Sequence, residues 1–408
     1  MPAQRRILSA TPAHREYVPL WCDNTQAILA ESTQGATFRL IRYAEMVELN
    51  QKKLKDVDWL LLLSPIALTA FGCVGINSSA PDGSFVKKQI ISLVIGLAIA
   101  IAIMFTDYRK IVTNIAPFFY AGVLALLVLV LVAGTQINGN KAWLRIAGFS
   151  LQPSEFAKAA TILMLARHLA HMRQSFLSIK DMLIMGAIVL PPLILVYAEH
   201  DTGTTLTFGA ILATFYFLGG MRKTLLAGGA VALCVGLVAV YPHLKRYQIE
   251  RINVIIHPEE ADPRGFGYQT IQSVIAVGSG GVVGKGIGNG TQGRLGFLPF
   301  AWTDFIAAVI AEETGLVGIM LLMVLYLVLI WRLIAVAKAS RERAGSLIVM
   351  GYVGLIAFHI LCNLGMVVAL MPIMGIPLPL VSYGGTAVMT MFMGVGLALS
   401  VRMRRFVN

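Results

Sequence analysis

Residues 296–313 read GFLPFAWTDFIAAVIAEE, where a polar loop runs directly into a long apolar helix and leaves Asp304 at its mouth. An ionisable side chain on such a helix costs roughly 2.5–3.5 kcal/mol at the bilayer centre and less near the interface. It is usually retained only where it lines water, a partner or a substrate. Asp304 is therefore the first candidate for a functional residue.

The composition of the whole chain is that of a polytopic membrane protein. Of its 408 residues 57% are hydrophobic and 13% are charged, and the mean hydropathy is +0.75. These are too few polar groups to cover a soluble globule. About 20 apolar residues cross the hydrocarbon layer as a helix. The sequence therefore predicts an all-α integral membrane protein with about ten transmembrane helices, near 58–77, 89–106, 111–134, 154–170, 181–198, 203–219, 223–241, 304–336, 346–370 and 384–401.

Lys and Arg in the short loops predict the orientation, because cytoplasmic loops carry the excess of positive charge. Both termini are expected in the cytoplasm. Residues 1–55 are expected to form a weakly ordered cytoplasmic extension without a secretory signal, with Met46 as an alternative start, followed by a membrane domain over 56–405. The net charge of +12 is explained by this topology and by contact with anionic membrane lipids, so no nucleic-acid partner is needed.

A large extracytoplasmic loop, 242–303, is predicted between the seventh and eighth helices, and it is too long to be a simple connector. Its first part, 243–258, suits an interfacial amphipathic helix or a solvated surface helix equally well. The Gly-rich part, 258–290, matches neither the Walker nor the dinucleotide pattern. The four cysteines are dispersed and indicate neither a disulfide framework nor a zinc site.

Several polar loops fall on the outer side together with Asp304. The loop before the fourth helix carries Trp143 and Arg145, and a helix start at Pro153 places Glu155 and Lys158 on one face, where they can pair. Further candidates lie at Glu199 and Asp201. Asp201 or Thr202 can cap the next helix, with capping favoured for Thr202 and a site role for Asp201. A proline- and glycine-rich segment over 370–389 is expected to be non-helical and must line a cavity or be buried. Glu312 and Glu313 are interpreted as structural pairs, and His359 and Asn363 as a buried hydrogen-bonding pair.

This set of residues suits one kind of chemistry. A carboxylate near cations can take a proton from an attacking hydroxyl while positive charge receives an anionic leaving group, of which a lipid-linked pyrophosphate is one example. The sequence offers no Ser-His-Asp arrangement, no Cys-His pair and no metal cluster. The residues alone leave the substrate class open.

The motifs DPRGFGYQTIQSVIAVGSGGVVGKGIGNG (262–290), FLPFAWTDFIAAVIAEETGLVG (297–318), NLGMVVALMPIMGIPLPLVSYGGT (363–386), LQPSEFAKAA (151–160) and TDYRK (106–110) resemble those of the SEDS family of bacterial shape, division and sporulation proteins. The resemblance covers about 55–405. It is strongest to the RodA branch, partly through DVDWLLLL at 56–63, with FtsW the close alternative. It implies a ten-helix inverting peptidoglycan glycosyltransferase of the bacterial cytoplasmic membrane, acting in cell elongation and rod shape.

The resemblance also implies roles for particular residues. Asp304 matches the family's essential aspartate and would be the general base that lets one lipid II attack the growing chain on the outer face, with undecaprenyl pyrophosphate leaving. Lys158 is the preferred diphosphate contact. The other expected substrate-binding residues are Glu155, Trp143, Arg145, Glu199, Asp201, Lys285, Gln272 and Ser382. A divalent cation, Mg or Mn, is compatible with the leaving group, although no cluster requires it.

A class B penicillin-binding protein and the elongation-complex proteins MreC and MreD are the implied protein partners. The chain departs from the family pattern at Gly296, Phe300, Trp302 and Ala142, and at Glu199 and His200, where relatives usually have Gln-Pro. Two other functions remain open. A lipid II flippase would use broken helices and midplane charges, and a non-catalytic scaffold would leave Asp304 without a role.

Overall fold

The computed structural model describes residues 57–80, 83–137, 140–146, 149–172, 176–222, 224–225, 227–229, 249 and 267–405. The expected N-terminal extension lies outside these residues, and so do almost all of the seventh predicted helix, 223–241, and of the predicted amphipathic helix, 243–258. The description below concerns the unit Val57–Asn408.

The predicted membrane helices other than the seventh appear as helices near their expected bounds. They are α2 (Trp59–Ser79), α3 (Ser84–Phe105), α5 (Ala116–Ala133), α6 (Pro153–His171), α7 (Ile179–Ala198), α8 (Thr202–Leu218), α13 (Ile306–Ala339), α14 (Arg343–Val367) and α15 (Gly385–Met403). A short helix α4 (Tyr108–Lys110) and a π-helical turn η1 (Ile111–Ile115) lead into α5, while α11 (Tyr268–Gly280) and α12 (Thr291–Arg294) precede α13.

In the described part of the chain, seven helical segments are long and apolar enough to cross a membrane. A helix satisfies its own backbone polar groups, which is the condition for lying in hydrocarbon. α8 is shorter, with 17 residues. α6 is less apolar because it carries Glu155, Lys158 and Arg167. The chain is thus a multi-pass membrane protein, as its composition predicts.

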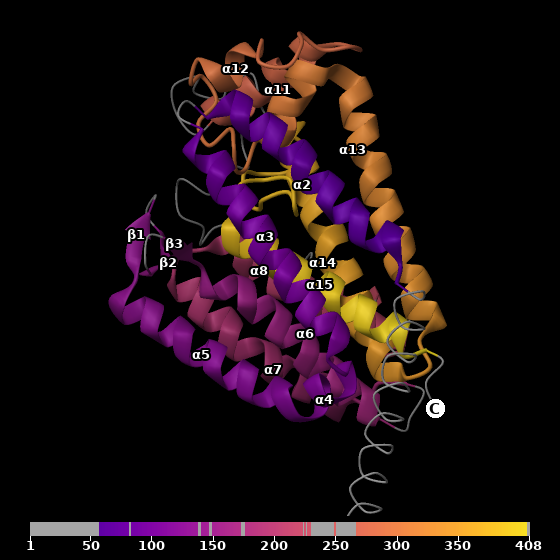
Figure 1. Cartoon of the computed structure of the whole chain (residues 1–408). Helices are drawn as coiled ribbons and strands as arrows, with labels where there is room; N and C mark the ends of the chain where they lie inside the picture. The colour runs from indigo at the N-terminus through magenta and orange to yellow at the C-terminus, as the bar shows by residue number, and fades with distance from the viewer. Residues whose placement is uncertain are drawn as a thin grey trace, which may run out of the picture. The chain divides into compact units, whose positions relative to one another are not determined.

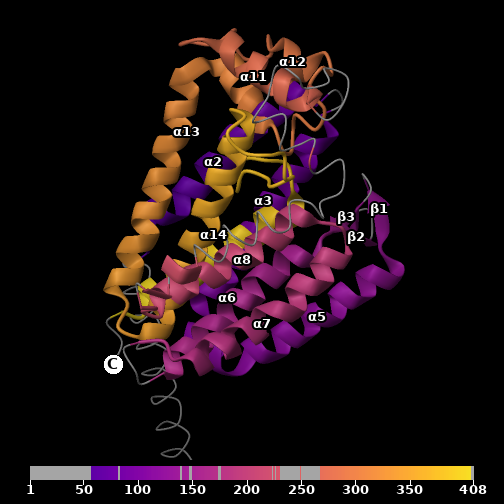
Figure 2. The same cartoon turned by 180° about the vertical axis from the view of Figure 1, so that it is seen from behind.

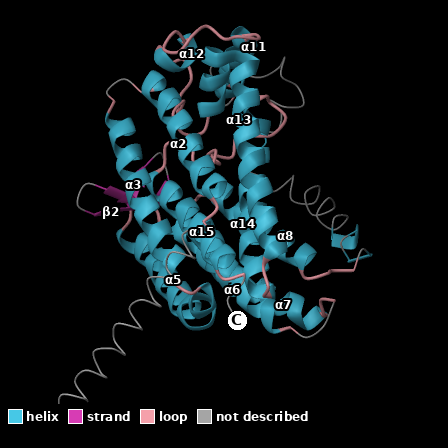
Figure 3. Cartoon of the chain, turned by 45° about the vertical axis from the view of Figure 1, so that its right-hand side comes forward, coloured by secondary structure: helices cyan, strands magenta, loops and turns pink. Residues whose placement is uncertain are grey.

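A small antiparallel sheet joins α5 to α6 and adds to the helical architecture that the sequence predicts (Figure 3). Its strands are β1 (Thr135–Ile137), β2 (Asn140–Ile146) and β3 (Phe149–Leu151), in the order β1-β2-β3. Lys141 on β2 donates from Nζ to the carbonyls of Leu131 and Val132 at 2.7 and 2.9 Å. These carbonyls lie at the end of α5, so Lys141 fastens the sheet to that helix.

The helices pack in two connected groups. α15 lies along α3, and α13 packs against α2 and α14 (Figure 1). α14 also contacts α6 and α8, while α5 and α7 pack beside α6 (Figure 2). Close approach of α15 to α3 requires a glycine at position 396, because a β-carbon at Gly396 would lie 2.7 Å from the carbonyl oxygen of Ala100. α14 joins the two groups, because it contacts α13 and α15 of the first and α6 and α8 of the second.

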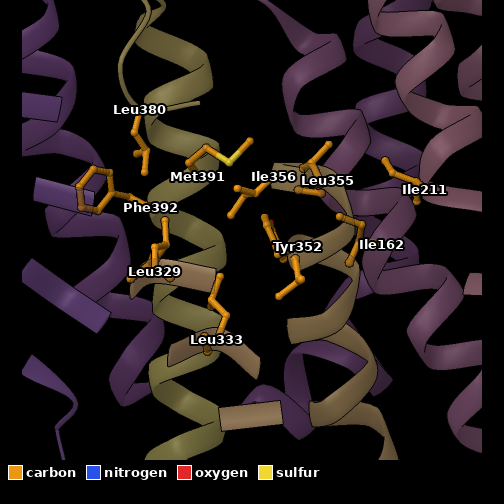
Figure 4. Packing of buried hydrophobic residues seen from close by; sticks show 14 of the residues in the cluster. Ile162, Ile211, Leu329, Leu333, Tyr352, Leu355, Ile356, Leu380, Met391 and Phe392 are labelled. Atoms are coloured by element: carbon orange, nitrogen blue, oxygen red, sulfur yellow. The ribbon is translucent and has the colours of Figure 1, made fainter. Parts of the chain in front are cut away.

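The centre of the bundle is formed by α14 and α15. In their most apolar windows 67% and 78% of residues are buried, against 22–44% in the other candidate spans. Figure 4 shows Tyr352 and Ile356 of α14 between Met391 of α15 and Ile162 of α6. Burial of each such side chain stabilises a bundle mainly through close packing, because lipid is as apolar as leucine.

At the end of the bundle away from Asp304, Asp58 joins three helices. Its carboxylate accepts from Arg332 of α13, with Nε at 3.0 Å, and forms an ion pair with Arg402 of α15 at 3.3 Å. The same side chain caps α2 by accepting from Leu61 N at 3.2 Å. Asp58 is only 4% exposed, so it is a buried charge with two cationic partners. This cluster fixes the ends of α2, α13 and α15 relative to one another.

Candidate active site

Asp304 sits in a turn two residues before α13, and its backbone is held from several sides. The three successive carbonyls of residues 302–304 accept hydrogen bonds from Tyr383 N, Ser382 Oγ and Asn363 Nδ2 at 2.9, 2.6 and 2.9 Å. The Asp304 side chain is partly exposed. A β-carbon on Gly375 would lie 3.7 Å from Asp304 Oδ2, so the backbone of Gly375 passes beside the carboxylate. The turn is therefore fixed by hydrogen bonds to its backbone, while Asp304 itself is partly exposed.

The segment between α14 and α15, residues 368–384, has no regular structure, as predicted, and its polar backbone groups are bound by buried side chains. Asn363 Nδ2 donates to Ile376 O at 2.9 Å, and His359 Nδ1 bonds Pro377 O at 3.1 Å. Because a carbonyl only accepts, Nδ1 carries the proton in this contact. His359 and Asn363 are thus both buried, but they bond this loop rather than pairing with each other.

Gln89 on α3 is a site residue that the sequence analysis missed. It is fully buried, donates from Nε2 to Ser382 O at 3.0 Å and accepts from Gly384 N at 3.2 Å. The sequence does show Gln89 as a single amide at the start of a long apolar helix. Such an amide, when buried, needs hydrogen-bond partners, so it could have been predicted to bind a neighbouring segment. Gln89 holds the end of the loop on which Ser382 and Tyr383 lie.

Glu155 and Lys158 form the predicted pair near the start of α6. Lys158 Nζ lies 2.8 Å from Glu155 Oε1, and the two residues are 1% and 3% exposed. Glu155 Oε2 is buried and has no hydrogen-bond partner among the described residues. A buried ion pair of this kind needs each partner, because either charge alone would be uncompensated.

Asp201, not Thr202, caps α8. Asp201 accepts from Thr204 N at 3.0 Å and from Thr204 Oγ1 at 2.8 Å, and it also accepts from Gln152 Nε2 at 3.2 Å. Gln152 is the residue before α6, so this contact joins the starts of two helices. Burial raises the pKa of Asp201, while the Thr204 hydrogen bonds and the positive charge of Lys158 oppose the increase.

Glu199, at the end of α7, is a buried carboxyl without a partner. It is fully buried, and neither of its oxygens has a hydrogen-bond partner among the described residues. Burial and, second, the negative charge of Asp201 raise the pKa of Glu199 to about 8. Glu199 is therefore mainly protonated at neutral pH.

The loop 368–384 brings these parts together. At the start of α8, a β-carbon on Gly203 would lie 2.2 Å from Met374 O, so α8 contacts the loop directly beside Gly375. On α14, His359 Nδ1 bonds Pro377 O of the same loop. One segment therefore passes beside the Asp304 carboxylate and also contacts the start of α8, two residues after Asp201.

Three residues that were expected to depart from the family pattern, Gly296, Phe300 and Trp302, lie in the segment just before Asp304. Trp302 stacks on Phe85 with ring centroids 5.1 Å apart, and Phe85 meets Tyr383 edge-on at 4.8 Å. Gly296 and Phe300 both have positive φ, at 75° and 56°. An aromatic cluster thus lies two residues before Asp304.

Four predicted site residues lie in other surroundings. Lys285 Nζ bonds Glu312 Oε1 at 2.7 Å, so this lysine is paired with α13. The pairing agrees with the structural role predicted for Glu312. Trp143 is partly buried and Arg145 exposed on β2, and Gln272 is partly exposed on α11.

A metal is not supported by the donors present. Within the described ranges, no three His, Cys, Asp or Glu side chains converge as a metal site. The reaction proposed below therefore includes no step through a metal.

An apolar cavity of about 600 Å³ lies between α11, α13 and α14, and Ala307 and Ala311 of the first turns of α13 contribute to its lining.

Comparison with known proteins agrees with this architecture. Residues 60–406 match the family model FtsW/RodA/SpoVE, described as cell cycle protein. The peptidoglycan glycosyltransferase MrdB of Escherichia coli K12 is 36% identical, over 86% of this chain and 94% of that protein. The probable peptidoglycan glycosyltransferase FtsW of Trichlorobacter lovleyi is 33% identical, over 87% and 96%.

Two solved structures share the fold. A chain of a peptidoglycan synthase complex that coordinates polymerization and crosslinking has a TM-score of 0.75 and 34% identity, over 86% of this chain and 99% of that one. The rod shape determining protein RodA of Thermus thermophilus has a TM-score of 0.65 and 30% identity, over 86% and 98%. This protein is therefore an enzyme that belongs to the FtsW/RodA/SpoVE family of peptidoglycan glycosyltransferases.

Proposed function

We propose that this protein polymerises lipid II into glycan strands with Asp304 as the general base. The observation that carries the proposal is the turn at 302–304, whose carbonyls are held from α14 and from the loop 368–384 while Asp304 remains partly exposed. A catalytic base must be held in place and must reach the proton that it takes. This turn provides both conditions at the end of a membrane helix.

The reaction follows from that position. The 4-hydroxyl oxygen of the GlcNAc on one lipid II forms a bond to the anomeric carbon of the MurNAc at the end of the growing chain. The bond from that carbon to the diphosphate breaks, undecaprenyl pyrophosphate leaves with the electron pair, and the anomeric centre inverts. Asp304 receives the hydroxyl proton. An apolar cavity that begins one turn beyond Asp304 suits the hydrocarbon of a lipid-linked sugar.

Lys158 is the proposed cation for the diphosphate. As found, it is buried and paired with Glu155, so direct contact requires the side chains around Lys158 to rearrange. Until then its charge compensates Glu155 and Asp201. Lys158→Met should reduce turnover of lipid II in a protein that still inserts in the membrane. Unchanged turnover by Lys158→Met would remove this lysine from the proposal.

The decisive experiment measures polymer formation from fluorescent lipid II by purified protein, with and without a class B penicillin-binding protein. Asp304→Asn keeps the shape and removes the base, so we expect a loss of about 10²–10⁴-fold, the usual contribution of a positioned base. Glu342→Gln is the matched control, because Glu342 is 41% exposed and pairs with Arg109 at the other end of the bundle. Polymerisation by Asp304→Asn at the normal rate would refute the mechanism.

The cellular role proposed is cell elongation and rod shape. The similarity to MrdB and to the rod shape determining protein supports it, and the similarity to FtsW proteins supports a division polymerase as the alternative. The proposal places the protein in the bacterial cytoplasmic membrane with both termini inside and Asp304 facing outward. A class B penicillin-binding protein is the proposed partner, supported by the solved synthase complex, with MreC and MreD as further partners. Depletion of this chain should give round cells; filaments would favour the division role.

A lipid II flippase is the second candidate, because α13 is broken at Gly315 and broken helices are typical of transporters. The two functions separate in sealed liposomes. A flippase moves fluorescent lipid II between leaflets without lengthening it, whereas a polymerase consumes it. Movement between leaflets that persists in Asp304→Asn would support the flippase.

A further inference from the structure

The break in α13 lies near the membrane surface. Gly315 has φ 64° and ψ −163°, which interrupts the helix. The part after the break, 316–339, is about 36 Å long at 1.5 Å per residue and can cross the hydrocarbon layer by itself. The break therefore lies at the Asp304 end of a helical segment long enough to span the bilayer.

The backbone groups that the break releases are bound by the loop after α11. Four main-chain hydrogen bonds of 2.9–3.1 Å join the two segments: Lys285 N to Glu312 O, Gly286 N to Glu313 O, Leu316 N to Gly281 O, and Val317 N to Val282 O. The approach needs a glycine at position 284, because a β-carbon there would lie 2.2 Å from Glu313 O. Irregular backbone can lie at membrane depth only when its polar groups are satisfied in this way.

The same loop exposes large apolar side chains. Val282, Val283 and Ile287 are 64%, 78% and 65% exposed, and Leu295 and Phe297 further on are 64% and 47% exposed. Soluble loops rarely expose so many large apolar groups together. In water this segment would be unfavourable, because each of these side chains would remain hydrated.

These side chains continue the lipid-facing surface of α13. Leu316, Val317 and Met320 are 55%, 58% and 59% exposed at the start of the span, and Leu316 and Val317 are the residues bonded to Gly281 and Val282. Of the cations in the loop, Lys285 is paired with Glu312, and Arg294 donates to Gly288 O at 2.8 Å. Both can extend toward phosphate headgroups at the interface.

We propose that residues 281–297 insert into the leaflet on the Asp304 side, with Val282, Val283 and Ile287 among the acyl chains. The occupant of this surface is the lipid bilayer, because the exposed side chains are continuous with the face that α13 already presents to lipid. The inserted segment ends seven residues before Asp304. It holds that turn at the level of the lipid headgroups, where a membrane-anchored sugar would lie.

The test uses single nitroxide labels on the full chain in lipid nanodiscs. Cys22, Cys73, Cys234 and Cys362 are first replaced by alanine. One label is then placed at Val283 through Val283→Cys. Val324→Cys, 51% exposed on α13, is the control in lipid, and Lys180→Cys, exposed at the start of α7, is the control in water.

Power saturation compares access of oxygen, which concentrates in lipid, with access of a water-soluble nickel chelate. We expect the Val283 label to show oxygen access close to that of Val324 and loss of the nickel access seen at Lys180. Nickel access equal to that at Lys180 would refute insertion. Exclusion of both reagents would also refute it, because protein rather than lipid would then cover the site. The measurement needs no turnover, so its outcome is independent of the polymerase proposal.

Discussion

Replacing Glu199 by glutamine tests the electrostatics of the buried cluster beside Asp304. Glu199 is fully buried without a hydrogen-bond partner in the described structure, and its pKa is raised from 4.5 to about 8. One pKa unit corresponds to about 1.4 kcal/mol. At pH 7 the unfolded carboxyl is ionised and the folded one is largely protonated, so the carboxyl lowers the free energy of unfolding by about 3 kcal/mol.

The sign follows from the raised pKa. Below pH 4.5 the carboxyl is protonated in both the folded and the unfolded state, so its ionisation does not lower the free energy of unfolding. Between pH 4.5 and about 8 only the unfolded state loses its proton, so stability falls as the pH rises, and above about 8 the cost is constant. Glu199→Gln removes this dependence, because the amide does not ionise.

The assay is thermal unfolding of the purified protein in detergent, followed by intrinsic fluorescence from pH 4.5 to pH 8.5. Glu199→Gln should unfold at nearly the wild-type temperature at the acid end and at an increasingly higher temperature toward pH 8. Glu342→Gln, whose carboxylate is 41% exposed and paired with Arg109, should not become stabilising as the pH rises. A difference between Glu199→Gln and wild type that stays constant over the whole range would refute the reasoning.

Three further substitutions test the supports of the site. Asn363→Leu removes the donor to the buried carbonyl of Ile376, at roughly 1–3 kcal/mol, and the donor to the part-buried carbonyl of Asp304. Polymerisation and thermal stability should both fall; normal activity would show that the 302–304 turn needs no anchor. Gly315→Ala should lower the free energy of unfolding by at least about 2 kcal/mol, because φ of Gly315 is 64° and a β-carbon there would lie 2.4 Å from Gly284 N. A variant that unfolds at the wild-type temperature would contradict the broken helix. Asp58→Ala leaves Arg332 without its buried partner and should lower the free energy of unfolding by roughly 3–5 kcal/mol, which thermal unfolding measures. A negligible shift of the unfolding temperature would mean that this cluster is solvated.

The helices could be read from the sequence because the apolar stretches are long and separated by basic loops. The same reasoning identified the position of Asp304 at the start of α13 and the pairing of Glu155 with Lys158 three residues apart. Local rules suffice for these features. The irregular segment 368–384 was equally predictable from its prolines and glycines.

Other features depend on contacts between distant residues and could not be predicted. Lys285 was expected at the substrate, but it pairs with Glu312, 27 residues further along and three residues before the break in α13. No pattern around Gly315 distinguishes a broken helix from a glycine inside a continuous one. The burial of Lys158 is equally non-local, since α6 packs against α8 and α14, which lie further along the chain.

The supports of the 302–304 turn have a consequence for the synthesis of the protein. Asn363 and Ser382 follow their hydrogen-bond partners by 59 and 79 residues, so the ribosome adds both only after α13 has been made. A nascent chain halted before Ser382 already contains Asp304 but lacks the hydroxyl that binds Thr303 O. If Asp304 is the base proposed above, we expect chains that stop before α15 to be inactive, because the 302–304 turn is not yet fully anchored.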